Sequence, residues 1–232
     1  MARLFLIPTN LGAPNDAPSL SVNELNQIKH LKHFIVETPK VGRAHLKALN
    51  LTTPLQQLDI QELNKHQHQL EQLIAPLLSG YDVGLLSDCG MPAIADPGSA
   101  IVNLAHLHNI QVIPLIGPCS LILALAGSGL NGQSFAFCGY LPIDGDLRSK
   151  RLKALQELIT KYKQSQIIIE APFRNLQLFD ALIKQLDPSI KLSLAINLMS
   201  SAQIITTHTI KAWQNLPTPN LHKQEVVFVI GI

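Results

Sequence analysis

Short apolar runs alternate with helix-like segments along the first half of the chain. Runs at 3–8, 33–36 and 83–86 each have the length and composition of one buried strand. Between the first two runs, Ser21 and Glu24 form a capping-box pattern at the start of an expected helix. Because parallel strands need a crossover connection, this alternation predicts a parallel, doubly wound sheet with helices on both faces.

The remaining elements expected in the first half follow the same alternation. A weak strand is expected at 55–58 and an apolar strand at 110–116, with helices at 41–49, 60–78 and 97–108. The second half has expected strands at 134–137, 167–170, 192–196, 203–208 and 226–230, and expected helices at 121–126, 147–162 and 176–186. No long helix separates the last two strands, which indicates a mixed sheet with antiparallel members. The sequence therefore predicts an α/β chain of two domains, an N-terminal parallel domain at 1–115 and a C-terminal mixed domain at 116–232.

Length and hydropathy agree with this class of protein. A chain of 232 residues can bury a substantial core. Although 47% of the residues are hydrophobic, no apolar run approaches the roughly 20 residues of a membrane span. The stretch 1–8 is also too short for the apolar core of a signal peptide. We therefore expect a cytoplasmic protein that makes no membrane contact.

Several chemistries lack their sequence patterns. Neither the dinucleotide turn G-x-G-x-x-G, nor the P-loop, nor the G-x-S-x-G elbow of hydrolases occurs. The histidine pairs at 66/68 and 106/108 point to different faces of a helix, so no metal site is expected. Three cysteines without short spacing indicate free thiols, and Cys89 is expected to be buried.

Two loops rich in Gly and Pro follow neighbouring expected strands. The first begins with Ser87 and Asp88 and continues through Gly90 and Met91 to Gly98, and the second runs from 117 to 120. Ligands of parallel α/β sheets bind beyond the carboxyl ends of the strands. An ordinary strand-to-helix turn is the alternative, but the number of Gly and Pro residues exceeds what a short connection requires. We expect the two loops to converge on one pocket for a small molecule.

The expected helix at 147–162 carries a basic face. Its basic residues are Arg148, Lys150, Arg151, Lys153 and Lys161. Such a face can contact the phosphates of a nucleic acid, but a charged helix face is more often only solvated, and no aromatic residues are interleaved with these cations. The formal net charge of +2 does not by itself indicate a nucleic-acid partner.

Five short motifs occur in order along nearly the whole chain. They are Pro8-Thr9, 87–98, Gly117-Pro118-Cys119-Ser120, Gly139-Tyr140-Leu141-Pro142 and Glu170-Ala171-Pro172-Phe173-Arg174. Together they resemble the tetrapyrrole methylase superfamily of class III S-adenosylmethionine-dependent methyltransferases. Within it the chain is most similar to the ribosomal RNA small-subunit methyltransferase I family, which methylates a cytidine ribose 2′-hydroxyl. The resemblance implies a homodimer, an RNA substrate, and S-adenosylmethionine bound in the cleft between the two domains.

The resemblance also implies contacts to the cofactor. It places them at Leu11, Gly12, Asp88, Met91, Ser120, Leu121, Glu170 and Ala171. Gly90 and Gly117 would let the backbone approach the cofactor, and Asp88 would accept its hydrogen bonds or offset its positive charge.

The motifs expected around the acceptor differ from the family pattern. The family's Glu-Asp-Thr-Arg is Glu37-Thr38-Pro39-Lys40 here, its motif histidine is Phe173, and its Arg-Glu-Leu-Thr is 196–199. Glu37 and Glu170 are the candidate catalytic acids, as a base or as groups that position the acceptor. The alternative is that they cap helices or pair with Lys40 and Arg174. The sequence therefore predicts a methyltransferase, with two alternatives: a protein that binds S-adenosylmethionine without catalysis, and a methyltransferase of a tetrapyrrole or another small molecule.

Overall fold

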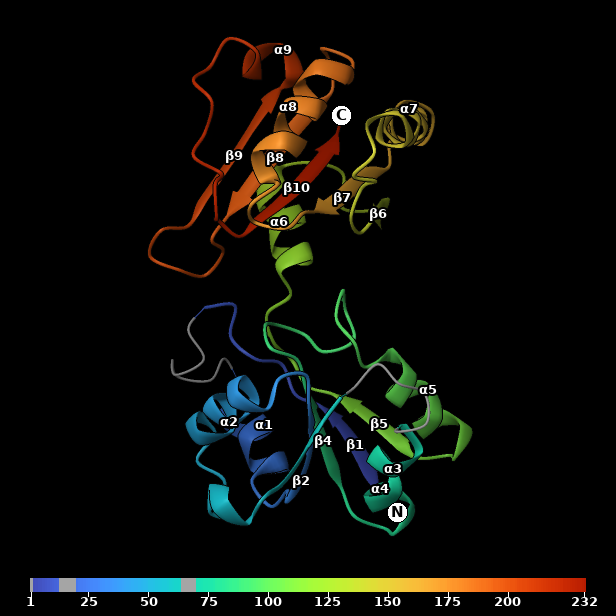
Figure 1. Cartoon of the computed structure of the whole chain (residues 1–232), viewed down its shortest axis with the longest axis vertical. Coiled ribbons are helices and arrows are strands. Elements are labelled where there is room, and N and C mark those ends of the chain that lie inside the picture. The colour runs from blue at the N-terminus through green and yellow to red at the C-terminus, as the bar shows by residue number, and fades with distance from the viewer. Residues whose placement is uncertain (1, 13–19, 64–69) are drawn as a thin grey trace. The chain divides into compact units, whose positions relative to one another are not determined.

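The computed structural model describes residues 2–12, 20–63 and 70–232 (Figure 1). Contacts within the chain divide it into two compact units, Met1–Cys119 and Ser120–Ile232. The boundary expected from the sequence, between residues 115 and 116, falls in the connection between the last strand of the first unit and the first helix of the second. That each unit is an independently folding domain stays a prediction.

The first unit contains one parallel sheet of five strands. These are β1 (Arg3–Leu6), β2 (His33–Val36), β3 (Asp59–Glu62), β4 (Val83–Leu86) and β5 (Gln111–Pro114). The strand order is β3-β2-β4-β1-β5, and every neighbouring pair is parallel. All five strands therefore end at the same edge of the sheet, which confirms the predicted parallel α/β fold.

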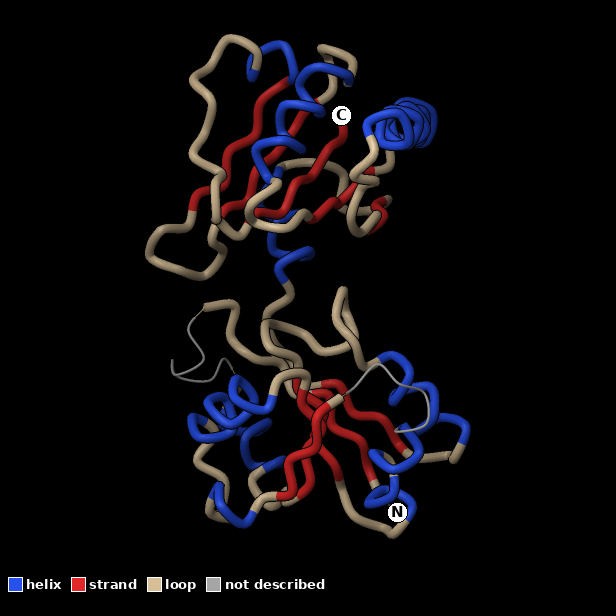
Figure 2. The backbone as a smooth tube through the Cα atoms, in the orientation of Figure 1, coloured by secondary structure: helices blue, strands red, loops and turns tan. Residues whose placement is uncertain are grey.

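Helices cover both faces of this sheet (Figures 1 and 2). The elements are α1 (Val22–Ile28), α2 (Pro39–Ala48), the short 3-10 helix η1 (Leu55–Gln57), α3 (Leu70–Leu73), α4 (Ala75–Leu78) and α5 (Ser99–Leu107). Adjacent side chains of β1 point to opposite faces. Phe5 packs in the layer of α1 and α2, whereas Leu4 packs with α5. Burial on both faces explains why the central strands are continuous apolar runs.

Two element predictions in this unit are wrong. Residues 55–58 do not form a strand, and the expected helix at 60–78 is replaced by β3 followed, after residues outside the described range, by α3 and α4. β3 is an edge strand whose residues are exposed or half-buried, so it lacks the apolar run of a buried strand. Its pairing with β2 therefore decides its structure.

The second unit contains a mixed sheet of five strands. These are β6 (Phe135–Phe137), β7 (Ser165–Ile169), β8 (Lys191–Ile196), β9 (Ile204–Thr209) and β10 (Val226–Gly231). In the order β6-β7-β10-β8-β9, only the β6–β7 pair is parallel. The predicted mixed sheet is confirmed, and β6 and β7 end at one edge.

The helices of the second unit are divided between the two faces of the mixed sheet. They are α6 (Ser120–Ser128), α7 (Gly145–Tyr162), α8 (Asn175–Gln185) and α9 (Ile210–Trp213). α6 packs on β8, β9 and β10, whereas α7, α8 and α9 share one apolar core with the sheet. No helix in the described parts of the chain is long and apolar enough to cross a membrane.

Candidate functional site

Three loops meet at the carboxyl edge of the parallel sheet. The backbone N–H of Thr9, after β1, donates to the carbonyl of Gly90, after β4, at 2.9 Å. A Cβ atom added at Gly90 would lie 3.3 Å from the carbonyl oxygen of Pro118, after β5. A Cβ atom added at Gly117 would lie only 2.1 Å from Cγ of Pro8. The two Gly/Pro loops recognised in the sequence therefore lie against each other and against the loop after β1.

The loop after β4 contains several residues with left-handed backbone conformations. Gly90 and Gly98 have φ values of +80° and +136°, which glycine adopts without steric cost. Ala93 and Ala95 have φ values of 65° and 64°. Such a conformation costs a residue with a Cβ on the order of 1 kcal/mol. Strain of this kind is concentrated at ligand sites, where the surrounding structure holds one loop shape.

Two carboxylates are connected by hydrogen bonds at the same edge. Asp88 accepts from the backbone N–H of Thr38 at 3.0 Å and from its hydroxyl at 2.6 Å. The backbone N–H of Asp88 in turn donates to Oε2 of Glu37 at 3.2 Å. The loops after β2 and β4 are thus held together. Asp88 keeps lone pairs for a ligand, because a carboxylate has about four acceptor positions.

Asp96 is a third acid of this group, and the sequence did not mark it as a site residue. Burial, together with the negative charges of Glu37 and Asp88, raises the pKa of Asp96 to about 6 against the opposing effect of a hydrogen bond from Ser87. Perturbed acids of this kind are concentrated at functional sites. Its position in the same Gly/Pro loop as Asp88 was the available signal in the sequence.

Replacing Asp96 with Asn should stabilise the protein at high pH. Because the pKa of Asp96 is higher in the folded than in the unfolded chain, its ionisation penalises folding as the pH rises through about 4 to 6. We expect Asp96→Asn to raise the free energy of unfolding by about 1–2 kcal/mol at pH near 8, after allowance for solvent screening of this half-buried group. Below a pH of about 4 the difference should vanish.

Urea unfolding across this pH range measures the Asp96 effect. The control is Asp180→Asn, which neutralises an exposed carboxylate on α8. A stability gain for Asp96→Asn that is equal at all pH values would contradict the assignment.

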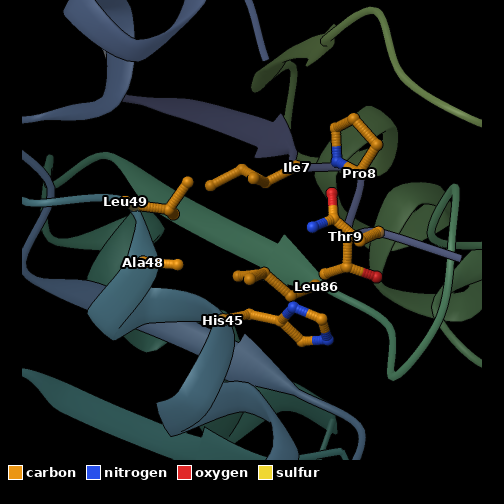
Figure 3. Close-up of a pocket in the computed structure, with 8 residues that line it drawn as sticks. Ile7, Pro8, Thr9, His45, Ala48, Leu49 and Leu86 are labelled. Atoms are coloured by element: carbon orange, nitrogen blue, oxygen red, sulfur yellow. The ribbon is translucent and has the colours of Figure 1, made fainter. Parts of the chain in front are cut away.

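A small cavity lies beneath the loops (Figure 3). Ile7, Leu49 and Leu86 contribute apolar walls, and the His45 ring lies beside Thr9. Its volume of about 10 Å³ is about that needed for one water molecule, so it cannot hold a cofactor. His45 Nε2 lies 3.0 Å from the carbonyl oxygen of Asp88, and burial lowers the pKa of this ring. The neutral ring therefore supports the loop of Asp88 from below.

Glu24 supports the loop after β5, a role that the sequence did not predict. One carboxylate oxygen completes the capping box with Ser21, and the other accepts from the backbone N–H of Ile116. Burial acts to raise the pKa of Glu24, but these hydrogen bonds outweigh burial and lower it. The capping pattern was visible in the sequence, whereas the bond to Ile116 depends on the fold.

The other expected cofactor contacts are distributed over both units. Leu11 is buried with its Cδ2 2.9 Å from a Cβ placed on Gly90, Gly12 is exposed, and Met91 is half-buried. Ser120 and Leu121 begin α6 in the second unit.

The expectation of a buried Cys89 is wrong: its position in the loop after β4 leaves it exposed.

Glu170 and Ala171 follow β7 in the second unit. Glu170 is held by Arg174, whose Nε and Nη2 lie 3.0 and 2.6 Å from Oε1, and by the N–H of Ala171 at 2.6 Å. The Glu170 side chain is only 7% exposed. The pairing with Arg174 that the sequence left as an alternative is thus present, and it orients this carboxylate.

Comparisons with known proteins identify the family. No family model matches the chain. The ribosomal RNA small subunit methyltransferase I of Hydrogenobaculum sp. is 30% identical over 235 aligned positions, which cover 99% of this chain and 95% of that protein. The chain belongs to the ribosomal RNA small subunit methyltransferase I family. The expectation of an S-adenosylmethionine-dependent methyltransferase is thereby confirmed.

A second relative bears the same name, and two solved structures share the fold. The protein of the same name from Buchnera aphidicola subsp. Schizaphis graminum is 27% identical over 98% of this chain and 77% of its own length. A cobalt precorrin-4 methyltransferase, CbiF, covers 99% of this chain and 94% of its own with a TM-score of 0.62 at 13% identity. The methyltransferase CobJ covers 99% of this chain and 93% of its own with a TM-score of 0.60 at 14% identity. At these identities the two structures show a shared fold.

Proposed function

We propose that this chain transfers a methyl group from S-adenosylmethionine to a ribose 2′-hydroxyl of small-subunit ribosomal RNA. The proposed substrate class follows the name shared by its relatives. The structural observation that supports it is the group of three acids, Glu37, Asp88 and Asp96, at the edge where three loops meet. Burial and, after it, the like charges of Glu37 and Asp88 raise the pKa of Asp96 there, and a cationic ligand would relieve the repulsion between these charges.

The residues present fit this cofactor. S-adenosylmethionine carries a sulfonium, an ammonium and a carboxylate, so its net charge is positive; Asp88 can offset this charge, and the cofactor supplies the methyl group when it is bound. Gly90 and Gly117 lie where a Cβ would collide with the neighbouring loop, so the absence of a side chain at these positions lets the loops of the proposed site pack closely against each other. We assign cofactor contacts to Leu11, Gly12, Asp88, Gly90, Met91, Gly117, Ser120, Leu121 and Ala171.

The chain's own acids have two proposed roles. Glu37 accepts one backbone hydrogen bond and has a second oxygen to receive the proton of the ribose hydroxyl. Glu170 is held by Arg174, so we assign it a positioning role. Among the residues that the structure describes, no three or more His, Cys, Asp or Glu side chains are grouped so that they could hold a metal ion.

The homodimer and the cytoplasmic location belong to the same proposal. Several large apolar side chains are exposed, among them Ile116 and Leu107, and burial of such side chains favours association. A ribosomal substrate requires a location where ribosomes are assembled. Light scattering of the purified protein measures its molar mass in solution and so tests the proposed homodimer.

Calorimetry and mass spectrometry test the proposed function. We expect S-adenosylmethionine to bind with a micromolar Kd and small-subunit ribosomal RNA from cells without this protein to gain one ribose methyl group. Binding without transfer to any acceptor would indicate a non-catalytic protein. Transfer to a tetrapyrrole or another small molecule, but not to RNA, would overturn the proposed substrate.

A further inference from the structure

The positive charge of the chain is concentrated in the segment 147–163, which is α7 without its first two residues and with the C-cap residue Lys163; α7 itself has five basic and two acidic residues. The segment 147–163 carries six basic residues against one acidic residue, a net charge of +5 in a chain whose total is +2. The remainder of the chain therefore has a net charge of −3. Such a local excess attracts polyanions far more than the total charge indicates.

The basic side chains of α7 point away from the core. Leu152, Leu155 and Ile159 form the buried stripe of the helix. Lys150, Arg151, Lys153 and Lys161 are exposed, and none of these four forms an ion pair within the described residues. The acidic residues Asp144 and Asp146 are confined to the N-cap and the first turn. The outer face of α7 is thus a basic strip, interrupted by the exposed Glu157 between Lys153 and Lys161, that follows a helix about 27 Å long.

Two exposed aromatic rings lie on adjacent loops, one of which leads into α7. β6 and β7 are parallel, and the N–H of Ile169 donates to the carbonyl of Gly139 at 3.2 Å, so the segments after these strands leave the sheet side by side. They carry Tyr140, 60% exposed, and Phe173, 66% exposed. The first segment leads directly into α7 (Figure 1). The aromatic residues missing from the helix itself are therefore supplied by the adjacent loops.

The Phe173 ring is held in place from one side. The guanidinium carbon of Arg174 lies 5.0 Å from its centroid, and Arg174 is itself fixed by Glu170. A rigid, exposed ring beside a cation is the arrangement on which unpaired nucleobases stack. Phe173 replaces the histidine of the family pattern, so this platform depends on the chain's own sequence.

We infer that Tyr140, Phe173 and the outer face of α7 form a binding surface for single-stranded RNA. Bases stack on the two rings, and the exposed cations of α7 bind the phosphates that follow. This inference rests on the proposed function, since it assigns the surface on which that enzyme holds its RNA. A duplex would engage the cations but not the rings, because its bases are already stacked.

Fluorescence anisotropy separates the contribution of base stacking on the two rings from that of phosphate binding by the cations of α7. The probe is a labelled, mixed-sequence single-stranded RNA of about 20 nucleotides, long enough for one groove-type site. We expect the double variant Lys150→Ala/Lys161→Ala to bind it about 10-fold more weakly at low salt. Its slope of log Kd against log salt should fall by about 1.4, or 0.7 for each lost phosphate contact. We expect Tyr140→Leu/Phe173→Leu to lose about 10-fold at every salt concentration with the slope unchanged, and to bind the matching duplex normally.

Matched variants control for charge and exposure. Lys184→Ala/Lys211→Ala removes two exposed charges elsewhere in the second unit, and Tyr81→Leu removes an aromatic ring that is 58% exposed. Both should bind like the wild type. Equal losses in test and control variants, or wild-type protein that does not bind the single strand, would overturn the inference.

Calorimetry with S-adenosylmethionine on the same variants separates this inference from the proposed function. Unchanged cofactor binding with lost RNA binding supports the surface. If the wild type methylates RNA and the variants bind RNA normally, only the surface is wrong. If the wild type does not bind S-adenosylmethionine, the proposed function fails whatever the RNA result.

Discussion

Gly117→Ala should lower methyl transfer at limiting S-adenosylmethionine by about 100-fold, the cost of misplacing reacting groups by roughly 1 Å. The added methyl group would lie 2.1 and 2.3 Å from two ring carbons of Pro8. A proline ring cannot rotate away, so the backbone after β5 or β1 must move. Pro118 packs against Gly90, and the displacement is therefore transmitted to the loop that carries Asp88.

Gly132→Ala is the matched control for the Gly117 variant. A Cβ at Gly132 meets nothing within 4 Å, and the residue is exposed. We expect Gly132→Ala to leave cofactor affinity and turnover unchanged. Overpacking at Gly117 should also cost about 1–3 kcal/mol of stability, so both proteins are assayed well below their melting temperatures. Normal cofactor affinity in folded Gly117→Ala would contradict the assignment of this loop.

Glu37→Gln should lower turnover by about 100-fold while the Kd for S-adenosylmethionine stays within about twofold, because loss of a general base affects the chemical step. The amide oxygen of Gln can still accept from the backbone N–H of Asp88. The loop contact is thus retained, and the ability to receive a proton is lost. Removing the charge of Glu37 should also lower the pKa of Asp96, because that charge contributes most, after burial, to raising this pKa.

Glu62→Gln is the control for the Glu37 variant. Glu62 ends the neighbouring strand β3 as an exposed glutamate, and its replacement should leave turnover unchanged. Single-turnover methylation of the ribosomal RNA separates chemistry from product release. Wild-type turnover in Glu37→Gln would remove this residue from the mechanism.

By comparison, Glu170→Gln should mainly destabilise the loop after β7, because it breaks the ion pair with Arg174.

The sequence predicted the sheets where the apolar runs are buried. β2 and β4 occur at their expected residues, because a strand covered on both faces must be apolar at every position. β3 was missed for the converse reason. Its side chains are partly solvated at the sheet edge, so the signal of a strand was absent and the surrounding periodicity favoured a helix.

The candidate site was only partly predictable. The role of Gly90 and Gly117 in the loops could be predicted from the sequence, because glycine permits and proline restricts backbone conformations locally. Asp96 was missed because its raised pKa depends on burial and on Glu37, which is far from it in the sequence. The bond from Glu24 to Ile116 likewise joins elements 92 positions apart.

The sequence by itself determined the α/β class, the Gly/Pro loops after β4 and β5, and the similarity to a methyltransferase family, since all three are encoded in local patterns. Only the tertiary structure decided that Thr38 bonds Asp88, that three acids share one edge, and that the segments carrying Tyr140 and Phe173 leave the sheet side by side. These depend on strand order and register. Electrostatic and hydrogen-bond energies are set by distances between residues remote in the chain, and folding alone fixes those distances.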